Sequence, residues 1–292
     1  MKLLSYLPPG SPDGQARYGA MTDRGIVDLT ARIGVDFPSL RALIAADALE
    51  TARRVLAAAD GVVDHDPTEV IFLPPIPEPQ KIWCIGVNYR DRNAEYRDNS
   101  DLPKYPSLFV RAPTSFVGHG QPVVRPRQSE QLDYEGELVL VIGKAARHVT
   151  AERALDHVFG MTLANEGTVR DWLRHGKFNV TQGKNFDRSG SIGPWIVTAD
   201  ELALDRPLDL STRVNGELRQ QDDTGRLMFP FADLIAYLTS FATLMPGDLI
   251  LTGTPTGAGA RFDPPRWLEP GDRVEVECTA IGTLRNDVVD EE

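Results

Sequence analysis

The run "LDYEGELVLVIG" (residues 132–143) is the feature that most constrains what this chain can fold into. Its second half is rich in Val, Leu and Ile and predicts a β-strand. Asp133, Glu135 and Glu137 lie two residues apart, and side chains alternate across a strand, so all three carboxylates are expected on one face. Like charges this close to an apolar run repel one another and resist burial. The fold must therefore offset their charge.

A divalent cation answers this requirement best. Two carboxylates on one strand face form half of a hard-oxygen site, and Mg²⁺ or Mn²⁺ commonly takes one or two carboxylates together with waters and substrate oxygens. The alternative is an exposed polar face on which Glu135 and Glu137 pair with arginines. Glu166, in "TLANEGTVRD", is a third acid where the end of an extended segment could point inward. This third acid favours the metal site.

The pattern of elements along the chain predicts many strands and few helices. Strands are expected in residues 81–89, 107–112, 122–126, 132–143, 192–198, 210–221, 249–254 and 273–288. An amphipathic helix is expected over 229–244, ending before Pro246-Gly247. Strand and helix do not alternate regularly, which argues against a doubly wound parallel sheet. The predicted fold class is α+β, mainly β.

A Pro-rich segment divides the chain into two predicted domains. Residues 1–75 form a small N-terminal α/β domain, with short strands joined by Gly, Pro and Asp turns and then Ala- and Leu-rich helices over 39–60. The segment "FLPPIPEPQK" (72–81) cannot be a helix interior and marks the boundary. The second domain covers 76–292. All candidate site residues fall in it, so the first domain is expected to support it or to contact a second subunit.

Charge and cysteine content exclude several classes of function. The net charge of −11 and the lack of a basic patch argue against nucleic acid and anionic membrane surfaces as partners. Cys84 and Cys278 are the two cysteines, so neither a disulfide framework nor a Cys-rich metal site is expected. The chain has no long apolar segment of the kind found in signal peptides or membrane spans. A cytoplasmic location is therefore predicted.

Further candidate residues lie in turns. Lys184, in "QGKNFDRSG", could stabilise an enolate beside a metal-bound carboxylate, or could be a surface lysine. The Gly-rich loop "LTGTPTGAGARF" (251–262) lacks the Lys-Ser/Thr ending of a nucleotide-binding P-loop. Its N–H groups could bind a carboxylate, with Thr254 contacting substrate, or it could be an ordinary tight loop. Asn88 and Tyr89 end a strand and could frame the pocket.

From about residue 81 to 287 the chain resembles the fumarylacetoacetate hydrolase superfamily. The phrases "IGVNYRDRNAEY", "DYEGELVLVIG", "ANEGTVRD", "VNGELRQ" and "MPGDLILTGTPTGAG" match its signature phrases in order and spacing. The resemblance implies a mixed β-roll catalytic domain and usually a homodimer. It also implies Mg²⁺ or Mn²⁺, which Ca²⁺ could replace in crystals, held at Glu135, Glu137 and Glu166. The implied substrates are 2-oxo or 2,4-dioxo carboxylates that chelate the metal.

The chain departs from the family pattern where water is activated. Arg92 stands where many hydrolytic members have a His that works with a Glu, here Glu95. An arginine stays charged and cannot act as a general base near neutral pH, whereas it suits bidentate binding of a substrate carboxylate. The alternative is a solvent-facing Arg92 paired with Asp91 or Glu95. His175, in "RHGKFN", could replace the missing His or be a loop residue.

Three other positions differ from the commonest pattern. Asn165-Glu166 stands in place of Asn-Asp, and Leu173 in place of a Gln. Arg111-Ala112 stands in place of Lys-Pro. Glu166 keeps the charge of the usual Asp but reaches one methylene further. The predicted metal site is therefore intact, while the predicted water-activating pair is altered.

The reaction favoured by the sequence is hydrolysis of a C–C bond in an acylpyruvate or 2,4-diketo acid of a catabolic pathway. The cation and Lys184 would stabilise the departing enolate. Decarboxylation, hydration or isomerisation of a related 2-oxo dicarboxylate would use the same intermediate. A non-catalytic protein that binds metal or ligand is the alternative of another class. Residues 90–106 are expected to form a lid that excludes water.

Overall fold

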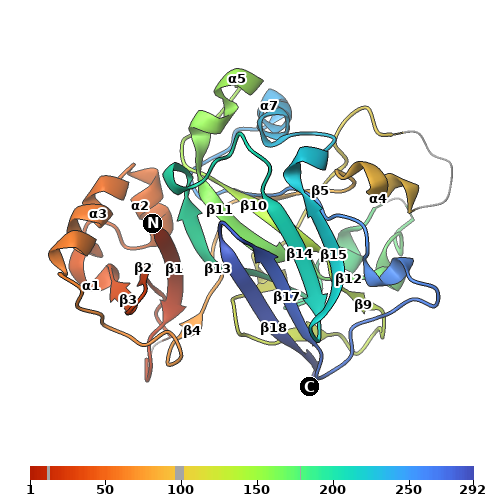
Figure 1. The fold of residues 1–292 in the computed structure, drawn as a ribbon, viewed down its shortest axis with the longest axis horizontal. Helices are drawn as coiled ribbons and strands as arrows, with labels where there is room; N and C mark the ends of the chain where they lie inside the picture. Colours follow the sequence, from red (N-terminus) through yellow and green to blue (C-terminus); the bar gives the residue numbers. More distant parts are fainter. Residues whose placement is uncertain (12–13, 96–101, 178) are drawn as a thin grey trace.

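Three β-sheets and a few helices make up the computed structural model, which describes residues 1–11, 14–95, 102–177 and 179–292 (Figure 1). The described residues form a mixed α/β structure dominated by strands, which confirms the predicted fold class. Among them, no helix has the length and apolar character needed to cross a membrane.

The largest sheet runs through the centre of the molecule. Its strand order is β3-β2-β1-β13-β11-β10-β16-β5-β6, with β4 paired to β1 and β7 paired to β13. These strands are β1 (Lys2–Leu7), β2 (Arg17–Thr22), β3 (Gly25–Asp28), β4 (Ile71–Phe72), β5 (Ile82–Ile85), β6 (Leu108–Val110), β7 (Phe116–Val117), β10 (Gly136–Ile142), β11 (Val158–Asn165), β13 (Gly190–Thr198) and β16 (Leu249–Leu251).

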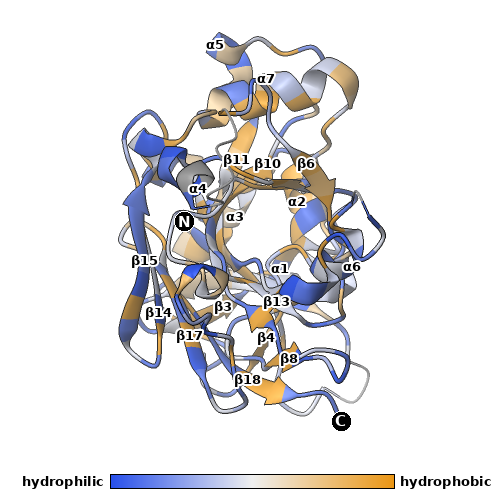
Figure 2. Cartoon of the chain, turned by 90° about the vertical axis from the view of Figure 1, so that its right-hand side faces the viewer, coloured by the Kyte–Doolittle hydropathy of each residue, from blue (hydrophilic) through white to orange (hydrophobic). Residues whose placement is uncertain are grey.

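A second sheet lies beside β13 and β11, with the order β15-β14-β17-β18-β8, and β12 pairs with β9 in a short two-stranded sheet. These strands are β8 (Val123–Arg125), β9 (Leu132–Asp133), β12 (Thr168–Val169), β14 (Asp209–Val214), β15 (Glu217–Asp223), β17 (Arg273–Cys278) and β18 (Gly282–Asp290). Hydropathy differs between individual strands: β10 and β11 are largely hydrophobic, whereas β15, at the edge of the second sheet, is mainly hydrophilic (Figure 2).

The helices are short and lie at the edges of the sheets (Figure 1). The α-helices are α1 (Thr30–Ile33), α2 (Leu40–Ala45), α3 (Leu49–Ala58), α4 (Arg90–Ala94), α5 (Ala151–Ala154), α6 (Thr181–Lys184) and α7 (Phe231–Phe241). The 3₁₀ turns are η1 (Pro113–Ser115), η2 (Leu155–His157), η3 (Arg170–Trp172), η4 (Ala199–Glu201), η5 (Thr224–Arg226) and η6 (Gly259–Arg261).

The N-terminal 75 residues continue the central sheet. Lys2 and Leu3 of β1 pair with Val197 and Ile196 of β13, and α1 to α3 gather around β1 to β3 (Figure 1). One apolar cluster contains residues from α2 and α3 as well as from β10, β13 and β16. The division at residue 75 stays a prediction, and the shared sheet and cluster couple the two parts mechanically.

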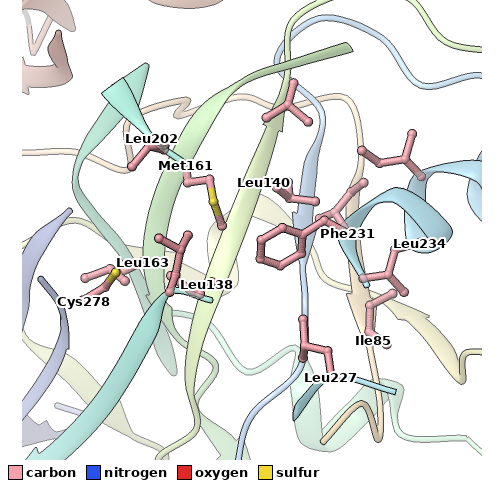
Figure 3. Packing of buried hydrophobic residues seen from close by; sticks show 14 of the residues in the cluster. Ile85, Leu138, Leu140, Met161, Leu163, Leu202, Leu227, Phe231, Leu234 and Cys278 are labelled. Carbon is pink, nitrogen blue, oxygen red and sulfur yellow. The ribbon is translucent and has the colours of Figure 1, made fainter. Parts of the chain in front are cut away.

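Strand β10 is buried on both faces, which explains its unbroken apolar run. Leu138 and Leu140 belong to the cluster that includes Phe231 of α7 (Figure 3). Val139 and Val141 point the other way, into the cluster shared with the N-terminal helices. Strand β10 therefore lies at the centre of the hydrophobic core. Its position determines where the acidic residues that come before it are placed.

Several predicted elements differ in extent from the observed ones. The strands predicted for 210–221 and 273–288 are each two antiparallel strands, β14 with β15 and β17 with β18. The first pair reverses direction at Asn215-Gly216, where both residues have a positive φ. The single strand predicted for 132–143 is divided into β9 and β10, because side-chain oxygens accept the N–H groups of the two residues between them: Tyr134 N donates to Asp133 Oδ1 and Glu135 N to Asn165 Oδ1. Helix α7 ends at Phe241, earlier than predicted, and the chain then turns extended.

Candidate active site

A cavity of about 660 Å³ opens beside the ends of β10 and β11. One wall is charged and carries Glu135, Glu166, Arg92, Arg170 and Lys184. The lining also contains apolar side chains, from Trp83, Val87, Leu108, Phe109, Val110, Leu173 and Val180. Two of the three predicted metal ligands and the predicted catalytic lysine thus face one cavity.

The antiparallel pairing of β10 with β11 brings the first and third acids together. Gly136 pairs with Asn165, so Glu135 and Glu166 each lie one residue beyond the same end of the ladder. The Glu166 N–H donates to the Glu135 carbonyl at 2.7 Å and fixes this contact. Residues 31 positions apart are therefore neighbours because the hydrophobic strands between them pair in this register.

Glu135 is the most heavily paired acid of the cavity. Its Oε1 accepts hydrogen bonds from Arg92 at 3.0 Å and Arg170 at 2.7 Å. Its Oε2 accepts from Lys184 at 2.6 Å and Thr168 at 3.0 Å. Burial alone would raise the pKa of this carboxyl, but Arg170, Lys184 and Arg92 outweigh burial and hold the pKa well below its ordinary value. Glu135 is therefore a buried carboxylate anion.

Glu137, two residues later, has the opposite environment. Its Oε2 accepts a hydrogen bond from the Gly253 N–H at 2.7 Å. Burial, and then the charges of Glu166 and Glu135, raise the pKa of this carboxyl well above its ordinary value. The side chain is buried and is not part of the cavity lining. Glu137 therefore lies close enough to Glu135 and Glu166 to feel their charge. Among the described residues it has no cationic side chain as an ion-pair partner.

Lys184 bridges two acids at the inner end of the cavity. Its Nζ donates to Glu135 Oε2 at 2.6 Å and Glu166 Oε2 at 3.0 Å, and it lies 5.0 Å from the centre of the Phe109 ring. Burial alone would lower the pKa of this ammonium, but the two carboxylates raise it above its ordinary value. The sequence-based alternative of a surface lysine is wrong, because the side chain is buried.

Arg92 is buried at the cavity and does not lie on the solvent face of its helix. One guanidinium nitrogen donates to Glu135, and the other bonds Glu95 at short range. Glu95 in turn accepts the Gly257 N–H at 2.9 Å. Arg92, predicted to bind substrate, and Glu95, predicted to be catalytic, thus connect α4 to the carboxylate cluster and the Gly-rich loop. A contact between Arg92 and substrate stays a prediction.

The predicted lid over 90–106 is only partly described. Arg90–Ala94 form α4, whereas 96–101 lie outside the described residues. Asp91 pairs with Arg226 of η5, so the described end of the segment is attached to the body of the protein. Movement of the segment stays a prediction.

The remaining residues predicted to contact substrate do not line the cavity. Their side chains contact the surrounding protein instead. Asn88 bonds the backbone of Phe229 and Thr252. Tyr89 is buried in the apolar core around α7. The Thr254 hydroxyl donates to the Gly136 carbonyl at 2.9 Å. These side chains hold the walls in place, and their contact with substrate stays a prediction.

Two arginines complete the site without having been assigned a role in it from the sequence. Arg170 donates to Asp133 Oδ2 and Glu135 Oε1, both at 2.7 Å. Arg111 is buried with a guanidinium nitrogen 3.8 Å from Glu166 Oε1. The signals were present: Arg170 follows the Glu166 phrase, and Arg111 replaces a family lysine. Their partners are distant in sequence, which is why the pairing could not be predicted.

His175 is not brought to the carboxylates. Its ring stacks on Trp172, with centroids 4.2 Å apart and planes 6° from parallel. The side chain is exposed and is not part of the cavity lining. The structure therefore gives no support to His175 as a replacement for the missing family histidine.

The carboxylates suit a divalent cation in chemistry more than in their present arrangement. All three are hard oxygen donors, and Glu166 Oε1 is buried without a hydrogen-bond partner. The raised pKa of Glu137 marks uncompensated negative charge that a cation would relieve. Within the described ranges, however, no three acids, histidines or cysteines converge closely enough to hold an ion. Both oxygens of Glu135 are bonded to Lys184 or to arginines. Metal binding at these residues stays a prediction.

Comparison with known proteins supports the resemblance seen in the sequence. The family model "Fumarylacetoacetate (FAA) hydrolase C-terminal" matches residues 81–289. The human mitochondrial oxaloacetate tautomerase FAHD2B is 43% identical over 243 residues, which cover 82% of this chain and 76% of that protein. Oxaloacetate tautomerase YisK of Bacillus subtilis is 42% identical over 224 residues, covering 76% and 74%. Maleylpyruvate hydrolase from Sphingobium, solved with manganese(II) and pyruvate, matches all of both chains with a TM-score of 0.80 and 29% identity.

Proposed function

The chain belongs to the fumarylacetoacetate hydrolase family, and on that premise we propose that it catalyses the keto–enol tautomerisation of a 2-oxo dicarboxylate such as oxaloacetate. Two relatives named as oxaloacetate tautomerases, the human and the Bacillus subtilis protein, share 43% and 42% of their aligned residues with it. Isomerisation was one of the reactions that the sequence left open. It now takes precedence over hydrolysis of a C–C bond.

The burial of Arg92 carries this proposal. Hydrolysis requires a group that takes a proton from water, and the position expected for that base holds a guanidinium, which cannot accept one. Arg92 is also engaged by Glu135 and Glu95. Among the described residues that line the cavity there is no histidine. Tautomerisation makes a smaller demand, since it moves one proton within the substrate and needs no activated water.

Lys184 is the residue best placed to serve that proton transfer. In the enol-to-keto direction the O–H bond at C2 breaks, a C–H bond forms at C3, and the proton count of the substrate does not change. Between the two steps the substrate is an enolate whose negative charge needs a nearby cation. The proton released from the enol oxygen passes to solvent. Lys184 is a buried ammonium at the cavity surface, so it can stabilise the enolate, donate its proton to C3 and regain a proton from solvent.

A divalent cation fits the same scheme. Glu135, Glu137 and Glu166 would hold it, and it would supply positive charge close to the carboxylate and oxygen of the substrate. Lys184 would then have to give up part of its contact with Glu135, because that carboxylate has donors on both oxygens. The apolar lining residues, with Phe109 beside Lys184, lower the local dielectric constant and strengthen these charge interactions.

The test follows the ultraviolet absorbance of enol oxaloacetate with Mg²⁺ or Mn²⁺ and compares the wild type with Lys184→Gln. The wild type should remove the enol band faster than buffer, and Lys184→Gln should be slower by about 100-fold or more. Lys177→Gln, an exposed change outside the cavity lining, should behave as wild type. A Lys184→Gln variant as fast as the wild type would refute this assignment of the proton carrier.

Hydrolysis of an acylpyruvate is the second candidate function. The structural match to a maleylpyruvate hydrolase with bound pyruvate favours it. Product analysis separates the reactions, because hydrolysis gives two acids, decarboxylation gives CO₂, and tautomerisation gives neither. Binding of oxo acids without any turnover would favour the non-catalytic alternative. A homodimer and a cytoplasmic location remain predictions from the sequence.

A further inference from the structure

Four cationic side chains line the cavity, and they differ in how their charge is used. Arg92, Arg170 and Lys184 each contact one or two carboxylates of the protein. Arg174 also lines the cavity, but among the residues that the structure describes it has no acidic side chain within 4.0 Å. The cavity thus presents one guanidinium whose charge is available to a ligand.

The ion-paired cluster at and next to the cavity is close to electrically neutral. Its four cations and the four carboxylates that they pair with are Arg92, Arg111, Arg170, Lys184, Asp133, Glu95, Glu135 and Glu166. Glu137 lies close to this cluster and brings no cationic partner with it among the described residues. These paired side chains therefore offer little net attraction to a substrate that carries two negative charges. Arg174, which has no acidic partner among the described residues, gains importance for that reason.

Arg174 lies at the mouth of the cavity, between η3 and α6. The residue is exposed and still contributes to the lining, which places it where the cavity meets solvent. Its backbone has a positive φ of 60°, and its N–H bonds the Asn179 carbonyl at 3.2 Å. The segment is anchored on one side by Trp172, which packs edge-on against Phe186 with centroids 5.1 Å apart. The same segment ends at Lys184, so one stretch of chain supplies both the mouth and the inner cation.

We propose that Arg174 binds the distal carboxylate of the substrate and sets a preference for dicarboxylic over monocarboxylic 2-oxo acids. This proposal rests on the proposed function, because it assumes that the 2-oxo acid end reaches Lys184. A guanidinium offers paired donors that match a carboxylate. Arg174 thereby takes the role that the sequence assigned to Arg92, whose donors bind Glu135 and Glu95.

Two ligands of equal chain length test the subsite without requiring turnover. 2-Oxoglutarate and 2-oxopentanoate differ only in a distal carboxylate against a methyl group. Calorimetry with Mg²⁺ present should show that the wild type binds 2-oxoglutarate about tenfold more tightly. Arg174→Gln should reduce that preference to within about twofold by acting on 2-oxoglutarate alone, and Arg174→Lys should keep part of it.

Lys177→Gln is the matched control, because it removes one positive charge from the same segment outside the cavity lining. It should keep the full preference. The proposal is overturned if the wild type has no preference, if Arg174→Gln keeps it, or if Lys177→Gln loses as much as Arg174→Gln. Oxaloacetate tautomerisation is measured on the same samples. A wild type that shows the Arg174-dependent preference without tautomerising would refute the proposed reaction and leave the subsite standing.

Discussion

The two halves of the run 132–143 meet opposite physical demands within one stretch of chain. The apolar half, Leu138–Ile142, is stabilised by two hydrophobic clusters, one on each face of β10. The acidic half contains Asp133, Glu135 and Glu137, all buried, and needs charged or polar partners brought from distant segments. Local pattern is enough to specify the first half. The second half depends on tertiary contacts. The negative charge of each acid is offset to a different degree there, so that the pKa is lowered for Glu135 and raised for Glu137.

Replacing the two glutamates separately is the strongest way to break this comparison. Glu135→Gln removes the anion that Arg92, Arg170 and Lys184 share, and buried cations without their partner typically destabilise a fold by about 3–5 kcal/mol. Glu137→Gln removes no ion pair and relieves repulsion, so the metal-free protein should change by less than about 1 kcal/mol. Urea unfolding of both variants measures the difference. Equal losses would show that the two acids are not compensated differently.

The apolar half gives a second test of stability. Leu140 is fully buried against the cluster around α7, and Leu140→Ala should lower the free energy of unfolding by about 2–4 kcal/mol through lost burial and a cavity. Ligand preference should be retained in the folded fraction. A loss below about 1 kcal/mol in urea unfolding would mean that this face repacks readily.

Measurements of metal affinity should show what Glu137 contributes to the site. Its replacement by Gln leaves the metal-free fold nearly unchanged but removes a candidate ligand, so Mn²⁺ affinity should fall at least tenfold, about 1.4 kcal/mol. Glu166→Gln should do the same. Calorimetry with Mn²⁺ on both variants measures this effect, with Glu201→Gln, at a distant surface turn, as control. Unchanged Mn²⁺ affinity in both variants would show that the metal binds at other residues.

Much of the apolar half and part of the site could be predicted from the sequence. The period-two and apolar patterns located the strands, and the acid phrases with Lys184 located the charged wall. The division between β9 and β10 could not be predicted, because one of the competing hydrogen bonds comes from Asn165, which is 30 residues away from Glu135 in the sequence. Pairing of Arg170 with Asp133 depends in the same way on contacts across many residues.

The smallest expected effect lies at His119, far from the carboxylates. Burial, aided by Arg285, lowers the pKa of His119 to about 4, and its Nδ1 accepts the Arg285 N–H at 3.2 Å. The unfolded chain takes up a proton near pH 6.5, so stability should fall as pH drops from about 6.5 to about 4, by about 1 kcal/mol for this partly buried ring. His119→Gln should flatten that part of the curve, measured by urea unfolding at several pH values. An unchanged curve would show that His119 does not contribute to it.

Proton transfer at C3 of the substrate is the central claim, and exchange with solvent deuterium measures it most directly. Oxaloacetate is incubated with the wild type and Mg²⁺ in D₂O and followed by proton NMR. Enzymatic tautomerisation predicts that deuterium replaces the C3 protons faster than in buffer, while the carbon skeleton stays intact and Lys184→Gln abolishes the excess rate. Formation of pyruvate and CO₂ at the full enzymatic rate without excess exchange, or exchange no faster than in buffer, would contradict the account.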